Sequence, residues 1–135
     1  YGIGDLAALV TDTHKFESRY LDTLVAAYPE QAHVYQERSP IHHTDKLNAP
    51  MILLQGLEDR VVPPNQARSM AAAVRAKGLP VALVEFPGEA HGFRQAATIH
   101  AAYHAELSFY GQVWGFVPAG DVPVLQIENL PAPAE

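Results

Sequence analysis

Cysteine is absent from the sequence, which therefore has no disulfide scaffold, no thiolate nucleophile and no cysteine-ligated zinc site. Basic residues are scarce, since nine Lys and Arg stand against fifteen Asp and Glu, and the formal net charge is −6 at pH 7. This balance argues against nucleic acid or an anionic membrane surface as the main partner, because the chain offers neither of them a basic patch.

Long apolar runs are lacking as well. No stretch approaches the roughly 20 apolar residues that cross a bilayer, and no targeting segment opens the chain. We therefore expect a cytoplasmic protein without a membrane span. Apolar residues nevertheless make up 48% of the 135 residues, which is enough for the core of one domain of ordinary size.

Two short apolar runs in the middle of the chain predict strands. Residues 51–55 lie between Pro50 and Gly56, and residues 81–86 are ended by Pro87. Apolar runs of this length between such breakers are typical of strands that are buried on both faces.

Helical patterns follow both runs. A helix is predicted from Pro63 to about Lys77, because its apolar residues recur on one face and Gly78 suits its end. A second is predicted over residues 96–114, and a shorter one over residues 16–27, ended by Pro29. The helix at 96–114 carries an apolar stripe that we interpret as core, formed by Ile99, Tyr103, Leu107, Tyr110 and Trp114.

The order strand, helix, strand, helix predicts an α/β fold with parallel strands and flanking helices. A right-handed crossover between the strands brings both of their carboxyl ends to the same edge of the sheet. The loops after residues 55 and 86 should therefore lie close together, where ligands and chemistry gather in open α/β sheets.

Each of these loops carries one residue suited to proton transfer. Asp59 follows the first strand, and His91 follows the second and precedes Gly92. A carboxylate that accepts the Nδ1–H of an imidazole fixes its tautomer and stabilises the imidazolium, as in a Ser-His-Asp triad. The alternative is a surface carboxylate and a histidine that caps a turn.

The two loops also carry a family resemblance. Residues 55–63 read Gln-Gly-x-x-Asp-x-x-Val-Pro, and residues 89–93 read Glu-x-His-Gly-Phe. Together with Arg-Ser-Pro at 38–40 and Glu-Leu-Ser-Phe-Tyr at 106–110, they resemble the C-terminal part of the α/β-hydrolase catalytic domain of the prolyl oligopeptidase family. These serine peptidases include dipeptidyl aminopeptidases and acylaminoacyl peptidases.

The resemblance covers residues 1–116 and has several implications. Asp59 and His91 match the acid and the base of the triad, and neither a metal nor an organic cofactor is needed. The substrate would be a short peptide, because the family's full-length members have an N-terminal β-propeller that restricts access. Phe93 would border the substrate cleft, although a direct contact with substrate stays open.

The nucleophile is not apparent, because none of the four serines lies in a Gly-x-Ser-x-Gly elbow. We expect the elbow to lie upstream, so that the chain is a fragment of a larger peptidase and inactive alone. An esterase or dienelactone-hydrolase relative, which shares the order of these residues, is the enzymatic alternative. The other alternative is a non-catalytic interaction module. The serines are Ser18, Ser39, Ser69 and Ser108.

A fragment with two strands leaves the edge of residues 51–55 without a neighbour. Such an edge is a template for pairing, so we expect a homo-oligomer or a rearranged N-terminal zone that hides it. Residues 117–135 are rich in proline and predict an extended arm with a mobile end, in which residues 122–127 favour a short strand.

Other titratable residues receive structural interpretations. His100 and His104 have the i, i+4 spacing of a metal pair, but no glutamate stands between them. We interpret this pair, like His42 and His43, as polar surface or caps rather than metal ligands. Glu58 and Glu89 are expected to be solvated or to pair with Arg60 or Arg94.

Overall fold

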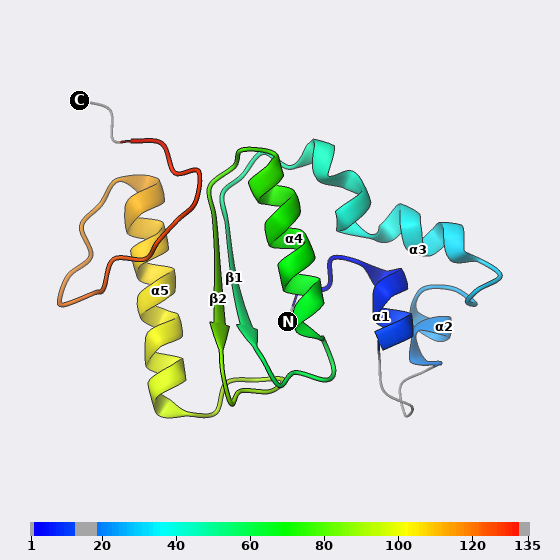
Figure 1. Cartoon of the computed structure of the whole chain (residues 1–135). Coiled ribbons are helices and arrows are strands. Elements are labelled where there is room, and N and C mark those ends of the chain that lie inside the picture. Colours follow the sequence, from blue (N-terminus) through cyan, green and yellow to red (C-terminus); the bar gives the residue numbers. More distant parts are fainter. Residues whose placement is uncertain (1, 13–18, 133–135) are drawn as a thin grey trace.

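Two parallel strands form the centre of the computed structural model, which describes residues 2–12 and 19–132 (Figure 1). Met51 lies opposite Val81 at the start of the strands, and Gly56 lies opposite Phe86 at their end. Both predicted strands are therefore confirmed. The elements in chain order are α1 (Leu6–Asp12), α2 (Tyr20–Leu24), α3 (Ala32–Arg38), the 3-10 helix η1 (Pro40–Lys46), β1 (Met51–Gly56), α4 (Pro64–Ala76), β2 (Val81–Phe86) and α5 (Ala96–Trp114).

Helices α4 and α5 lie on opposite sides of the strand pair (Figure 1). The main core lies between α4 and the sheet, where Met70, Ala71 and Val74 of α4 pack against Val81. Leu53 and Leu83 of the strands, both partly buried, extend this cluster. The apolar face predicted for α4 is thus the face that packs.

The apolar stripe of α5 is not core, so that interpretation is wrong. Tyr103 and Trp114 are 68% and 71% exposed. The physical reason is that α5 turns a different face inward, and small residues let it approach a sheet only two strands wide. The buried residues of α5 are Ala102, Ala105, Ser108, Phe109 and Gly111.

Buried polar side chains tie the N-terminal zone to α4. The Gln66 side chain accepts hydrogen bonds from the backbone N–H groups of Gly4 and Asp5, and it donates to the Asp5 carbonyl. The Ser39 hydroxyl accepts from the Leu6 N–H and donates to the Tyr35 carbonyl. This zone therefore packs against the α/β unit through satisfied polar contacts.

The helix predicted over residues 16–27 is present only in part. Helix α2 covers Tyr20–Leu24, and residues 13–18 lie outside the described part of the chain. After α2 the Tyr28 N–H donates to the Asp22 carboxylate at 3.4 Å.

The outer edge of β1 has no strand beside it within the described residues. Gly2, Ile3 and Gly4 lie next to this edge and help to line a cavity of about 410 Å³ with β1 and Glu106, but they do not form a strand on it.

Residues 117–132 form an extended arm without a regular strand, so the strand predicted over residues 122–127 is wrong. The backbone of Leu125 binds the side chains of Ser108 and Gln112 on α5 instead of a neighbouring strand. A single antiparallel bridge joins Glu128 to Val81. The predicted mobile end at residues 133–135 lies outside the described residues. No helix in the described ranges is both long and apolar enough to cross a membrane.

Candidate active site

The loops that follow β1 and β2 are joined through their backbones at the carboxyl ends of the strands. The Leu57 N–H donates to the Phe86 carbonyl at 3.0 Å, and the Glu58 N–H donates to the Glu89 carbonyl at 2.9 Å. Gly56 permits this approach, because a Cβ at its position would stand 2.5 Å from the carbonyl oxygens of Glu89 and Ala90. Glycine is therefore required where the loops meet.

Asp59 and His91 come together at this edge, as the loop geometry predicts. Oδ2 of Asp59 lies 2.9 Å from Nδ1 of His91. Oδ1 accepts hydrogen bonds from the N–H groups of Val61 and Val62, each at 2.9 Å. Three hydrogen bonds thus hold a carboxylate whose side chain is 1% exposed, while the imidazole is 38% exposed.

The contact orients the imidazole. An ionised carboxylate only accepts hydrogen bonds, so Nδ1 of His91 carries the hydrogen and donates it to Asp59. Nε2 stands on the other side of the ring and is the nitrogen suited to accept a proton. The chain leaves His91 through Gly92, whose φ of +104° favours glycine.

Glu89 is buried, so the expectation of a solvated side chain is wrong, whereas the alternative expectation of an interaction with Arg94 is met through the backbone N–H and the charge of that residue. Its carboxylate accepts the backbone N–H groups of Arg94 and Gln95, each at 3.0 Å, directly before α5 begins. The hydrogen bond from Arg94 is the main cause that lowers the pKa of Glu89, and bonds from Thr98 and Gln95 act in the same direction. Glu89 thus connects the loop of His91 to the first turn of α5.

Sequence reasoning missed this role of Glu89. A signal was available, because an acidic residue a few positions before a predicted helix is suited to accept its unpaired N–H groups. Glu58, by contrast, is exposed as expected.

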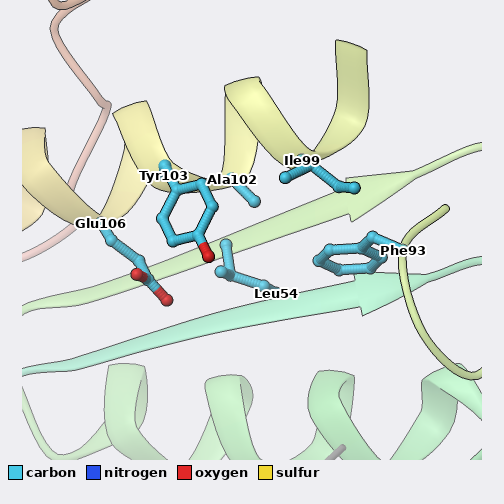
Figure 2. Close-up of a pocket in the computed structure, with 6 residues that line it drawn as sticks. All are labelled: Leu54, Phe93, Ile99, Ala102, Tyr103 and Glu106. Carbon is cyan, nitrogen blue, oxygen red and sulfur yellow. The ribbon is translucent and has the colours of Figure 1, made fainter. Parts of the chain in front are cut away.

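Phe93 packs against the end of the sheet. Its ring meets Phe86 edge to face, with centroids 4.9 Å apart. It also lines a cavity of about 330 Å³ between the sheet and α5. Figure 2 shows Phe93 beside Leu54, with side chains of α5 across the cavity, namely Ile99, Ala102, Tyr103 and Glu106.

Several of the serines and of the remaining histidines have contacts of their own. The hydroxyls of Ser39 and Ser108 bind backbone groups, Ser69 lies on α4, and Ser18 is outside the described residues. The rings of His100 and His104 lie 4.0 Å apart. Within residues 2–12 and 19–132, no group of three or more His, Asp or Glu side chains is arranged to hold a metal ion.

Comparison with known proteins now decides the family. A model of the prolyl oligopeptidase family matches residues 1–116. The chain belongs to this family. The resemblance seen in its motifs is thereby confirmed, and the fold is that of the C-terminal part of an α/β-hydrolase domain, with hydrolases of the serine peptidase type as relatives.

Three similar proteins illustrate the match. A solved puromycin-hydrolysing peptidase from Mycobacterium tuberculosis superposes with a TM-score of 0.86 at 46% identity, over 94% of this chain and 19% of that one. Esterase LipQ from the same species is 30% identical over 85% of this chain and 28% of its own length. Dipeptidyl aminopeptidase BIII from Pseudoxanthomonas mexicana is 33% identical over 58% of this chain and 12% of its own. The chain therefore spans less than a third of each relative.

Gly56→Ala should push the two loops apart. The added methyl group would meet two backbone oxygens, which cannot rotate away as a flexible side chain would. We expect a loss of about 1–3 kcal/mol in the free energy of unfolding, measured by denaturant titration. Gly2→Ala is the matched control, since nothing lies within 4 Å of a Cβ there. Equal stability of both variants would contradict the crowding.

Glu89→Gln should change how stability depends on pH. The pKa of Glu89 is lower in the folded chain than its ordinary value of 4.5, so its contribution is present above that value and is lost as the pH falls through the folded pKa. The variant should unfold at a lower denaturant concentration at pH 7, and the difference from wild type should shrink towards pH 3. Glu58→Gln, at an exposed position, is the control. A difference that stays constant with pH would contradict the role.

Proposed function

We propose that this chain supplies the acid and the base of a Ser-His-Asp triad in a serine peptidase that hydrolyses peptide bonds of short peptides. The observation that carries the proposal is the 2.9 Å contact between Asp59 Oδ2 and His91 Nδ1 at the carboxyl ends of two parallel strands. The similarity to a puromycin-hydrolysing peptidase and to a dipeptidyl aminopeptidase supports the reaction class.

In the proposed reaction, His91 moves the proton. Nε2 takes the proton of a serine hydroxyl while the serine oxygen attacks the peptide carbonyl carbon. The imidazolium then gives this proton to the leaving amine as the C–N bond breaks, which leaves an acyl-serine. A water molecule, deprotonated by His91, attacks the acyl-serine, and the acid product leaves as the serine regains its proton.

Asp59 acts on the reaction through His91. Its carboxylate is fixed by the N–H groups of Val61 and Val62, so the oxygen facing the imidazole has little freedom to turn away. A carboxylate held in this way keeps the hydrogen on Nδ1 and stabilises the imidazolium after proton transfer.

The serine of this triad comes from outside the 135 residues. No serine of the chain stands in a Gly-x-Ser-x-Gly sequence, and two of the four have their hydroxyls engaged by backbone groups of the fold. We infer that the isolated chain is inactive, and that its place is in a cytoplasmic enzyme several times longer.

An esterase is the second candidate, because LipQ matches 85% of this chain. The same Asp59–His91 pair would serve it, with an alcohol rather than an amine as the leaving group. Hydrolysis of aminoacyl amides and of simple esters by the longer protein distinguishes the two candidates, and a preference for esters would favour the second. A non-catalytic interaction module would hydrolyse neither.

Substitutions in the longer protein test the roles of the pair. His91→Ala should remove nearly all turnover, and Asp59→Asn should lower kcat by about 10⁴-fold, because the wrong tautomer is then favoured. Glu58→Gln, one residue away and exposed, is the matched control for a carboxylate-to-amide change. The measurement is steady-state hydrolysis of an aminoacyl amide, with circular dichroism to verify the fold. A small loss in both variants would place the acid and the base elsewhere.

Besides the missing serine, the outer edge of β1 needs a partner, since no strand lies beside it within the described residues. In a longer chain we propose that another strand of the same sheet occupies it, and in the isolated chain a second copy.

Small-angle X-ray scattering tests this proposal for the isolated chain. We expect a particle of twice the monomer mass, because an unpaired strand edge between two helices is a favourable site for pairing. A compact monomer over the whole concentration range would contradict it.

A further inference from the structure

The arm formed by residues 117–132 lies beyond the span that the family model matches. It begins after Gly115, which ends α5 with a φ of +73°. Figure 1 shows the arm turning back across α5 and reaching the strand pair near the start of β2. Its contacts therefore lie on the side of the molecule away from the outer edge of β1.

The first anchor of the arm is on α5. The Ser108 hydroxyl, which is buried, accepts the Leu125 N–H at 2.9 Å. The Gln112 side chain donates to the Leu125 carbonyl at 2.9 Å and to the Ser108 hydroxyl at 3.2 Å. Both backbone groups of Leu125 are thus satisfied by side chains, which holds the arm beside α5.

The second anchor is at the start of β2. The Glu128 N–H donates to the Val81 carbonyl at 2.9 Å, and the Val81 N–H donates to the Glu128 carbonyl at 3.0 Å. The Arg75 guanidinium binds both carboxylate oxygens of Glu128, at 2.5 and 2.6 Å. The Asn129 side chain donates to the carbonyls of Arg75 and Leu79. A bidentate ion pair and backbone hydrogen bonds thus fix one short segment.

These contacts occupy the start of the outer edge of β2, at Val81. The inner edge of β2 pairs with β1, and the backbone groups of Val81 face outward to the arm. The alternation of a strand directs the backbone groups of Leu83 and Glu85 to the same outer edge. The arm makes a single bridge there and does not add a third strand, in keeping with its prolines at 118, 123 and 131.

We propose that the arm guards the outer edge of β2 against pairing with the β2 strand of a second copy of this chain, and that the Arg75–Glu128 contact holds it there. A second copy is the fitting partner, because a two-fold axis beside an edge strand brings two identical edges together in antiparallel order. An edge of this kind must be covered, charged or paired to avoid association. Here an extended, proline-containing segment occupies the edge at Val81 and stands in the way of a second strand there.

Reversal of one charge in the whole chain tests the proposal. Arg75→Glu places two carboxylates together and should release the arm from Val81. We expect hydrogen exchange at the Val81 amide, measured by NMR, to accelerate about fivefold or more. Sedimentation should show a mass above that of the wild type at equal concentration. As the protein concentration rises, the Val81 amide should regain protection, and the outward-facing amides of Leu83 and Glu85 should gain it.

The matched control is Arg68→Glu. Arg68 also extends from α4 and forms an exposed ion pair with a glutamate, Glu85 of β2, but it does not touch the arm through that pair. It should leave both the exchange at Val81 and the sedimentation unchanged. Circular dichroism shows whether Arg75→Glu is folded. If it is not, the same measurements are made on Glu128→Gln, which removes one charge with little change of shape.

Three results would overturn the proposal. Unchanged exchange at Val81 would mean that the ion pair does not hold the arm. Faster exchange without any gain in mass would mean that the exposed edge does not associate. A gain in mass with new protection confined to residues 51–54 would place the association at β1 instead of β2.

Discussion

The parallel pairing of β1 with β2 is the constraint on which the site depends. It brings two loops, whose residues Asp59 and His91 are 32 positions apart in the chain, to the same edge of the sheet, where backbone hydrogen bonds join them. Gly56 lets them approach to a distance that any side chain would prevent. The contact between Asp59 and His91 is a consequence of this approach, because neither loop alone holds both partners.

Burial of polar groups gives the site its rigidity. The carboxylates of Asp59 and Glu89 are almost entirely withdrawn from solvent, and each is satisfied by two backbone N–H groups. Asp59 steadies the turn after β1, and Glu89 joins the loop of His91 to α5. The imidazole of His91, two residues after Glu89 in the chain, is 38% exposed and faces the buried Asp59 carboxylate through Nδ1.

The two outer edges of the sheet are treated differently. Beside β1 the described chain leaves a cavity and no strand, and α5 turns Tyr103 and Trp114 outward on its exposed face. Beside β2 the arm binds the backbone of Val81 through the backbone of Glu128. The Glu128 carboxylate and the Asn129 amide bind Arg75 in the last turn of α4. A protein of this family that is several times longer has further elements to place, and the open side is where such elements have room.

The sequence by itself determined the strands, the helix between them, and the meeting of Asp59 with His91, because short apolar runs and a parallel crossover leave few alternatives for the loops that follow. Its motifs also indicated the family correctly. Only the tertiary structure decided that Glu89 is buried, that the stripe of α5 faces outward, and that the arm binds α5 side chains rather than forming a strand. Local patterns show which residues could be buried, but the number of neighbouring strands decides which face of a helix is covered. Likewise, the destination of a carboxylate or of an extended segment depends on donors that are distant in the chain.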